Sequence, residues 1–378
     1  MSDSARANGA EKPAVLIIGG LGYVGRFLAL HIHNNHLASE VRLVDKQLPE
    51  LAWLAPEFAE ACSRATFMQA DASKEANLSR IFTRSNGQEF DYVFNCGGET
   101  RYSQDDEVYK ARSHALSVCV GKEAARRKIR CFLEVSTGMV YKPKEKPRKE
   151  DDDLKPWLKL AKWKLQAEQD LAKIEGLRLC VLRLGHVYGP YTSKYLAMAL
   201  CLARVWQHEG ETMKWLWGRD LRNNTVHVED VARGMWHAAE WYCKSGDTRK
   251  PAPIFNIVDQ GNTSQGTLAD ILQQIFNVPQ VFEGSVRSKI AMLKLDNVVD
   301  ELNDDTLDIW AELQQESKTS ETTPLNPFME KELLKDNDLS LDGTAFMKET
   351  GFRYKHPTVT KQEIEAVIES YKRMNWWP

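Results

Sequence analysis

The sequence has no hydrophobic run long enough to cross a membrane. Although 43% of its 378 residues are hydrophobic, no stretch reaches the ~18 apolar residues that a spanning helix needs. Residues 1–12 are polar and small, without the apolar core of a secretory signal. We therefore expect a cytoplasmic protein that makes no contact with membranes.

The seven cysteines lack the spacing of a metal site or a disulfide framework. Their number is odd, and no two of them are separated by two residues. Most stand among apolar neighbours, as Cys180 does between Leu179 and Val181. Reduced, buried thiols in a reducing compartment explain this usage better than disulfides do, and we expect no bound metal.

The sequence also lacks an excess of charge of either sign. Its 50 Lys and Arg nearly balance its 53 Asp and Glu, which leaves a net charge of −3. A basic run from Lys142 to Lys149 is followed at once by the acidic run from Glu150 to Asp153, which is typical of a solvated loop. Binding to nucleic acid needs a basic surface, so nucleic acid is not an expected partner.

What the sequence does have is an alternation of short apolar runs with segments of helical pattern. Strands buried on both faces read as nearly continuous apolar runs, and strands that alternate with helices favour a parallel, doubly wound sheet. We therefore predict an α/β fold with a doubly wound, mostly parallel sheet. The expected strands are residues 14–18, 41–44, 66–69, 92–95, 131–135, 179–184, 226–228 and 254–258.

After Gly189-Pro190 the pattern changes to longer helical stretches. We expect a first domain of residues 13–188 plus 224–260, and a smaller α/β domain of residues 189–223 plus 261–378 that binds the substrate. Its acidic helical pieces are expected at Leu293–Leu302 and Thr306–Gln315. The terminal Trp376-Trp377 pair is expected to pack on the body of the protein, because exposed tandem tryptophans are unfavourable.

The strongest motif is Gly19-Gly20-Leu21-Gly22-Tyr23-Val24-Gly25, which follows the first strand and opens the first helix. Glycines at 19, 22 and 25 permit a tight turn, close approach of a pyrophosphate, and close packing of helix on strand. The helix N-terminus then offers free N–H groups to the phosphates. Asp45 ends the second strand, where a carboxylate accepts ribose hydroxyls and repels a 2′-phosphate. A dinucleotide site that favours NAD over NADP is predicted, and a purely structural turn is the alternative.

Further motifs occur in the order typical of one family. The motifs are Asp71-Ala72, Asn95–Gly98, Val135–Tyr141, Arg183–Pro190 and Val226–Ala232. From about residue 14 to 355 the chain resembles the extended short-chain dehydrogenases/reductases, the NAD-dependent epimerase/dehydratase family. The resemblance implies a Rossmann fold, NAD as cofactor, and a nucleotide sugar or similar small molecule as ligand.

The resemblance also assigns roles to individual residues. It implies catalytic roles for Thr137 and Lys164, and His186 is a candidate replacement for a missing base. Contacts with substrate are implied for Glu99, Thr137, His186 and Arg222. The residues implied to bind the cofactor are Gly19, Gly22, Tyr23, Val24, Gly25, Asp45, Asp71, Ala72, Cys96, Gly97, Gly98 and Lys164.

The chain departs from the family at the catalytic tyrosine. The family has Tyr-x-x-x-Lys followed by Glu, and the matching positions here are Leu160, Lys164 and Glu168. No tyrosine stands between Tyr141 and Tyr188, so no realignment restores it. Losing a positioned general base typically costs ~10²–10⁴ in rate. A second departure is the phosphate clamp, where Asn223 occupies the arginine position and Arg222 stands one residue early.

These departures leave two functions open. The chain is either an enzyme acting on a sugar nucleotide with another base, or a catalytically inactive NAD-binding pseudoenzyme with a scaffold or sensing role. His186 and Glu99 each have a structural alternative, as a hydrogen-bonded strand residue and a solvated loop carboxylate. By analogy with the family, a homodimer is expected through the helices of residues 108–128 and 155–173.

The position of Asp45 generates the first testable prediction. Replacing Asp45 with Ala removes the carboxylate that accepts the ribose hydroxyls and repels a 2′-phosphate, so the preference for NAD over NADP should narrow. Calorimetric titration of both nucleotides against the wild type and the variant measures that preference. An unchanged ratio of the two affinities would show that Asp45 does not contact the adenosine ribose.

Overall fold

The computed structural model describes residues 12–63, 66–244, 251–284, 295–320 and 322–378. Seven strands form one sheet in the order β10-β6-β5-β4-β1-β2-β3, and every neighbouring pair is parallel. The predicted doubly wound parallel sheet is therefore confirmed. The strands are β1 Ala14–Ile18, β2 Glu40–Asp45, β3 Phe67–Gln69, β4 Tyr92–Asn95, β5 Cys131–Thr137, β6 Leu179–Leu184 and β10 Ile254–Ile257.

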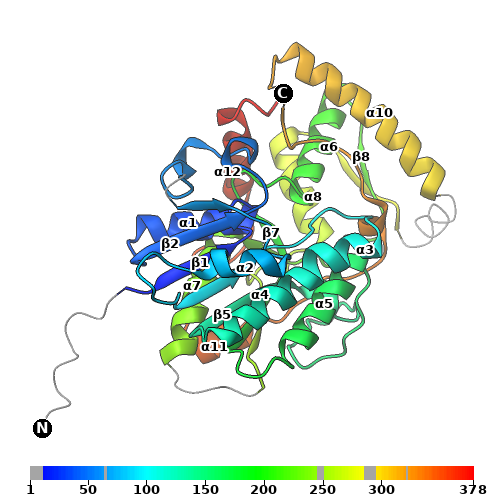
Figure 1. Ribbon diagram of the computed structural model, residues 1–378. Coiled ribbons are helices and arrows are strands. Elements are labelled where there is room, and N and C mark those ends of the chain that lie inside the picture. The colour runs from blue at the N-terminus through cyan, green and yellow to red at the C-terminus, as the bar shows by residue number, and fades with distance from the viewer. Residues whose placement is uncertain (1–11, 64–65, 245–250, 285–294, 321) are drawn as a thin grey trace, which may run out of the picture.

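Helices cover both faces of this sheet (Figure 1). One face carries α1 (Tyr23–Asn34) and α7 (Val228–Lys244), which pack against each other. The opposite face carries α2 (Glu75–Phe82), α4 (Ala115–Arg126) and α5 (Lys159–Leu171). Because both faces are covered, all five residues of β1 are buried, which is why its sequence is apolar throughout.

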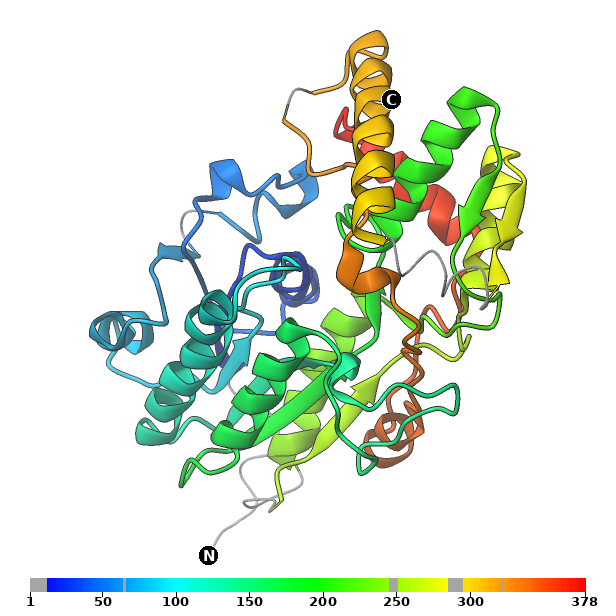
Figure 2. The ribbon, with the colours of Figure 1, turned by 90° about the vertical axis from the view of Figure 1, so that its right-hand side faces the viewer.

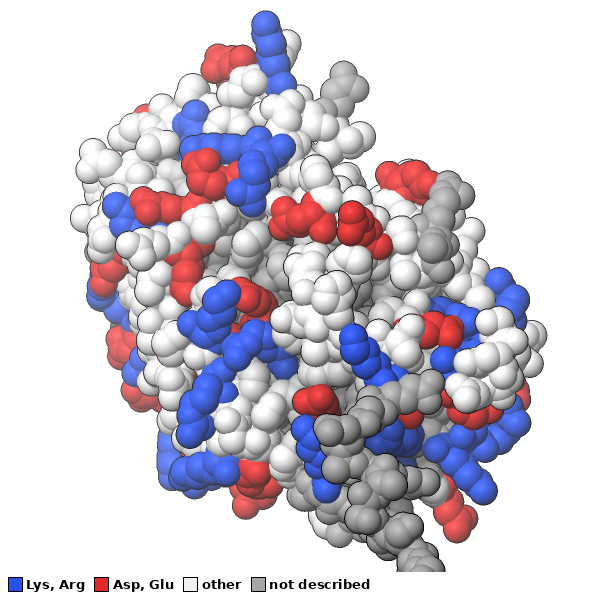
Figure 3. Space-filling view, turned by 90° about the vertical axis from the view of Figure 1, so that its left-hand side faces the viewer, with Lys and Arg blue, Asp and Glu red and all other residues white. Residues whose placement is uncertain are grey.

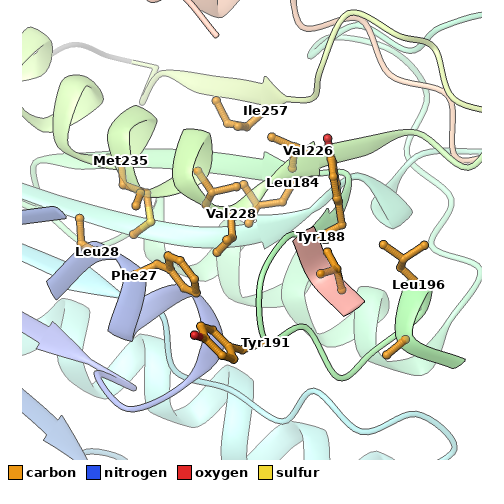
Figure 4. Close-up of a cluster of buried hydrophobic side chains, with 14 of the residues drawn as sticks. Phe27, Leu28, Leu184, Tyr188, Tyr191, Leu196, Val226, Val228, Met235 and Ile257 are labelled. Carbon is orange, nitrogen blue, oxygen red and sulfur yellow. The ribbon is translucent and has the colours of Figure 1, made fainter. Parts of the chain in front are cut away.

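A hydrophobic core fills the space between the sheet, α1 and α7. Figure 4 shows Phe27 and Leu28 from α1 near Met235 from α7, with Leu184 and Ile257 supplied by the sheet. All five are at most 9% exposed. Burying one such side chain fully is worth about 1.5–3 kcal/mol, so this layer fixes α1, and with it the glycine turn, against the sheet.

A second group of elements lies at one end of the sheet (Figure 2). Two short strands, β8 and β11, pair in parallel with each other and not with the main sheet. The helix α6 packs against α8 and α10, and α8 packs against α12. The elements are α6 Leu196–Glu209, β8 Met213–Trp215, α8 Gln265–Phe276, β11 Gln280–Phe282, α10 Leu295–Glu316 and α12 Lys361–Arg373.

The prediction of two separate acidic helices was wrong, because α10 runs without interruption from Leu295 to Glu316. Leu293, where the first piece was expected to begin, lies outside the described residues. The polar stretch after Leu302 is compatible with a helix because its side chains form hydrogen bonds within the helix or with a neighbouring segment. Asn303 accepts a hydrogen bond from the N–H of Met329 at 2.7 Å, and Thr306 donates one to the Leu302 carbonyl.

The terminal tryptophans pack on the body as predicted. Trp376 is 3% exposed, and Trp377 stacks on Tyr371 with ring centroids 5.8 Å apart. Trp377 also meets Trp310 of α10 edge-on. The end of the chain therefore links α12 to α10 through aromatic contacts.

The arrangement does not settle the predicted domain boundaries, which stay a prediction. β10 belongs to the main sheet although it follows the first segments of the second group. The helix α11 (Thr344–Thr350) packs against α7 and β10, and so lies with the sheet. The small sheet of β7 (His186–Tyr188) and β9 (Thr225–His227) connects the two groups.

The distribution of surface charge and the state of the cysteines match what the composition predicted. On the face shown in Figure 3, basic and acidic side chains are interspersed. All seven cysteines are free thiols. Within the described ranges, no helix combines the length and the apolar character needed to cross a membrane.

A charged network ties the loop before α12 to the start of α7. The ring of His356 contacts Glu229 through Nε2 at 3.0 Å and Glu363 through Nδ1 at 2.8 Å. The backbone N–H groups of Lys355 and His356 donate to the buried carboxylate of Asp230. These hydrogen bonds from Glu229 and Glu363 raise the pKa of His356 to about 9.

We predict a pH-dependent stability from this histidine. Because its pKa is raised on folding, its contribution is full below the ordinary histidine value of about 6.5 and is lost as the pH rises through about 9. After allowance for solvent screening, the loss is on the order of 1–2 kcal/mol. Urea unfolding at pH 6 and pH 9.5 should show His356→Gln destabilised at pH 6 and nearly equal to wild type at pH 9.5.

The control is His33→Gln, because His33 pairs with the exposed Glu60; its free energy of unfolding should follow that of the wild type at both pH values. A loss of stability in His356→Gln that is the same at both pH values would contradict the assignment.

Candidate functional site

The glycine turn after β1 leaves one side open. Gly22 is exposed, and a Cβ placed on it would meet only the carbonyl oxygen of Gly19, at 3.1 Å. Gly25, in contrast, is buried with a Cβ position that collides with Gly19 and Gly20. No side chain caps the helix at Gly22, so the first N–H groups of α1, including those of Tyr23 and Val24, have no partner within the helix.

This turn touches the turn after β4. Gly19 has a φ of +70°, and a Cβ on it would lie 2.7 Å from the backbone nitrogen of Gly97. The β1 and β4 strands are neighbours in the sheet although α1, β2, β3 and α2 lie between them in sequence. The strand order reverses at this point, which is where open parallel sheets of this kind bind their ligands.

Asp45 lies beside the same turn, at the end of β2. Its Oδ2 accepts a hydrogen bond from the Leu21 N–H at 3.2 Å, and its Oδ1 accepts one from Gln47. The side chain remains half-buried. The carboxylate is therefore held at the edge of the glycine turn, where the ribose of a bound dinucleotide is expected.

Asp71 and Ala72 follow β3, the next strand outward. Burial alone would raise the pKa of Asp71, but hydrogen bonds from the Ser73 hydroxyl and N–H lower it below the ordinary value. Ala72 is 3% exposed. The carboxylate stays ionised and is fixed locally by Ser73.

Lys164 of α5 reaches the turn after β4. Its ammonium donates to the carbonyl oxygens of Val135 at 2.8 Å and Gly97 at 3.3 Å. A Cβ on Gly98, whose φ is +147°, would lie 3.4 Å from the Lys164 Nζ. The structure thus brings together Gly97, Gly98 and Lys164, which were predicted separately.

A buried glutamate that we did not single out from the sequence pairs with this lysine. Glu134 Oε1 lies 3.4 Å from the Lys164 Nζ, and the carboxylate is fully buried. It accepts further hydrogen bonds from Asn95 at 2.6 Å and Ser117 at 2.8 Å. Burial raises the pKa of Glu134, and it outweighs Lys164, Asn95 and Ser117, which lower it. One indication of this residue was present in the sequence, since Glu134 is a charged residue within the apolar run of β5.

The neighbouring thiol does not offer a nucleophile. Cys96 stands between Asn95 and Gly97, and burial raises the pKa of its thiol to about 12. A thiol needs a lowered pKa to react as a thiolate near neutral pH. Cys96 therefore contributes packing beside the glycines.

Thr137 lies at the end of β5, and Leu160 lies at the beginning of α5. Thr137 is the last residue of β5, and its hydroxyl accepts a hydrogen bond from the Met139 N–H at 3.2 Å. Leu160 is half-buried in the first turn of α5, one turn before Lys164. Residues four apart share a helix face, so the leucine occupies the place from which a tyrosine at 160 would project. Glu168 is engaged elsewhere, in a buried ion pair with Arg183 at 2.6 Å.

His186 is buried and uncharged. Burial lowers its pKa to about 3, and its ring stacks on Tyr195 with centroids 3.8 Å apart. An imidazole with so low a pKa is a weak proton acceptor at neutral pH. The geometry favours a structural role for this residue, through burial and stacking and not through the predicted hydrogen bond of its ring with a described residue.

Glu99 is held by two arginines. It is 7% exposed, and its carboxylate accepts hydrogen bonds from Arg101 at 2.8 and 2.9 Å and from Arg112 at 2.9 Å. Burial opposes ionisation, but these arginines lower the pKa of Glu99 to about 2. The glutamate is therefore not a solvated loop residue, and it directly follows the turn that Lys164 contacts.

Arg222 points toward other partners. Its backbone N–H donates to Asp338, its Nη1 donates to the Asn262 carbonyl at 3.3 Å, and its Nη2 lies 3.8 Å from Glu145. None of these partners was predicted to belong to the site. A surface hollow of about 570 Å³ between α8 and the start of α12 includes Arg219 and Lys361; it contains none of the predicted site residues.

Known structures share this fold. WbmG from Bordetella bronchiseptica, solved with NAD and UDP, aligns with a TM-score of 0.66 at 16% identity over 97% of each chain. UDP-glucose 4-epimerase from Thermotoga maritima, solved with UDP-glucose, aligns with a TM-score of 0.65 at 18% identity, over 95% of this chain and 99% of that one. At such identities the likeness shows the fold. No curated protein matches the chain by sequence.

The sequence also matches a family model. The match covers residues 15–257, from β1 to the end of β10, which is well over half of the chain. The family resemblance inferred from the motifs is thereby confirmed: the chain belongs to the NAD dependent epimerase/dehydratase family.

Proposed function

We propose that this protein binds NAD at the glycine turn and a nucleotide sugar or similar ligand beside Thr137 and Lys164. One observation carries the proposal. At the point where the strand order reverses, Gly22 leaves the uncapped N-terminus of α1 open, with Asp45 at its edge. The structures of WbmG with NAD and UDP, and of the Thermotoga maritima enzyme with UDP-glucose, support the choice of ligands.

The residues present fit a dinucleotide. The N–H groups at the start of α1 suit a pyrophosphate, and the Asp45 carboxylate suits ribose hydroxyls and disfavours the 2′-phosphate of NADP. When bound, NAD exchanges a hydride with a substrate. Lys164 contacts the Gly97–Gly98 turn and so holds a positive charge along the expected path of the cofactor.

The proton chemistry of the site is restricted. Leu160 has no hydroxyl, His186 is neutral and buried, and Cys96 is protonated. Lys164 is paired with Glu134. We infer that the ordinary tyrosine-dependent oxidation of this family is very slow here. A catalytically inactive NAD-binding protein is accordingly the second candidate function, favoured by Leu160.

We propose a cytoplasmic location, which the seven free thiols support. We also propose a homodimer formed through the helical segments 108–128 and 155–173. This second proposal depends on the analogy with the family.

Replacing Gly22 with Val tests the cofactor site. The Cβ of a valine there makes one tight contact, with the Gly19 carbonyl oxygen at 3.1 Å, and the side chain obstructs the approach of a pyrophosphate. NAD affinity should therefore fall about tenfold or more, while the melting temperature should change much less. Gly218→Val is the control, because its Cβ would also meet only one atom, Asp220 Oδ1 at 3.7 Å. Calorimetry with NAD checks both variants; saturable NAD binding of equal strength in wild type and Gly22→Val would overturn the proposed cofactor site.

Turnover distinguishes the two candidate functions. Incubation of the wild type and NAD with UDP-, GDP- and dTDP-sugars should yield little epimer or dehydrated product, about 10²–10⁴ slower than with a positioned base. Leu160→Tyr restores the phenol one turn from Lys164, and a gain in rate would assign the deficit to this position. Turnover of several per second in the wild type, followed by mass spectrometry of the products, would instead show that another residue serves as the base.

A further inference from the structure

Two tyrosine hydroxyls near this site have no hydrogen-bond partner among the described residues. They belong to Tyr102, in the loop after β4, and Tyr195, at the start of α6; both side chains are half-buried. Neither hydroxyl is among the fully buried polar atoms that lack a partner, so each stays open to solvent and therefore to a ligand. The hydroxyls that do donate to protein oxygens belong to Tyr109, Tyr141, Tyr188, Tyr191 and Tyr371.

Tyr102 packs against residues that follow β5 and begin α5. Its ring packs against a cluster of buried side chains that includes Met139, Leu158 and Ala161. These residues flank Thr137 and Leu160 in sequence. Tyr102 also follows Glu99 by three residues, so the same loop contributes both side chains.

Tyr195 approaches from the segment after β7. Its ring stacks on His186 with an angle of 8° between the planes, and Tyr102 is near enough to raise the pKa of Tyr195. Its backbone has a φ of +26° and a ψ of −75°, a sparsely populated conformation for a residue with a side chain. Such strain costs about 1–3 kcal/mol and is concentrated at binding sites.

Both phenols remain protonated at neutral pH. Burial is the main cause that raises the pKa of each, and for Tyr102 the nearby Glu330 and Glu332 add to the effect. Those two carboxylates are held over the loop by Ser103, whose N–H donates to Glu332 at 2.9 Å. A protonated phenol can donate a hydrogen bond but cannot act as a base.

We propose that Tyr102 and Tyr195 are specificity-determining residues that donate hydrogen bonds to oxygen atoms of the ligand's sugar ring. The proposal rests on the proposed function, and it names the part of the ligand that this chain recognises with residues of its own. Tyr102 replaces one role of the phenol lost at position 160, the orientation of an oxygen atom. It does not replace the acceptance of a proton.

The test compares a nucleotide with its sugar conjugate. Calorimetry on the whole protein with saturating NAD gives the affinities of UDP and UDP-glucose, GDP and GDP-mannose, and dTDP and dTDP-glucose. Tyr102→Phe and Tyr195→Phe should each weaken the sugar conjugate that the wild type binds by about three- to tenfold, as expected for one neutral hydrogen bond. The affinities for the free nucleotide and for NAD should not change.

Tyr242→Phe is the matched control, because Tyr242 lies on α7 near Cys131 and Cys180 at the opposite end of the strands. Equal affinity of both tyrosine variants and the wild type for the sugar conjugate would overturn this inference while leaving the proposed function intact. If NAD binds but none of the three sugar conjugates does, the nucleotide-sugar part of the proposed function fails, and this inference fails with it. Each substitution keeps the ring, and if one variant does not fold, the other decides the outcome.

Discussion

The contact between two glycine turns determines the geometry of the whole site. Gly19 after β1 and Gly97 after β4 approach so closely that a Cβ on the first would lie 2.7 Å from the nitrogen of the second. Gly97 has no room on its other side either, since its own Cβ would lie 2.6 Å from Leu116 of α4. The start of α1, the β4 turn and α4 are therefore fixed relative to one another. Lys164 and Glu99 take their positions from the same turn.

Much of the fold was predictable because the sheet is buried on both faces. The bounds of β4 and β6 agree with the apolar runs at 92–95 and 179–184, since a strand covered on both sides has to be apolar along its length. The pattern was less informative where polar residues serve a structural purpose. α10 was predicted as two helices, and the hydrogen bond between Asn303 and Met329 that fixes the residues between them joins positions remote in sequence.

The same limit applies to the candidate site. The glycine turn and Lys164 were identifiable because local spacing defines them, but their partners are not local. Glu134 and Lys164 are thirty residues apart, and nothing in the motif around either residue indicates the other. His186 shows the converse, because its position in the motif suggested chemistry whereas its burial and its stacking on Tyr195 determine its actual state.

The pairing of Lys164 with Glu134 has an electrostatic consequence. An isolated ammonium group in a partly buried site repels any cation brought near it, by an energy that falls with distance and with effective dielectric constant. Here the Glu134 carboxyl lies 3.4 Å away. In its ionised form it would offset much of the lysine's charge, so that the field of the pair would decay faster than that of a single charge. The nicotinamide ring carries a positive charge in oxidised NAD and none in the reduced form. In the proposed NAD complex, a lysine compensated in this way would penalise the oxidised form less than a bare lysine would.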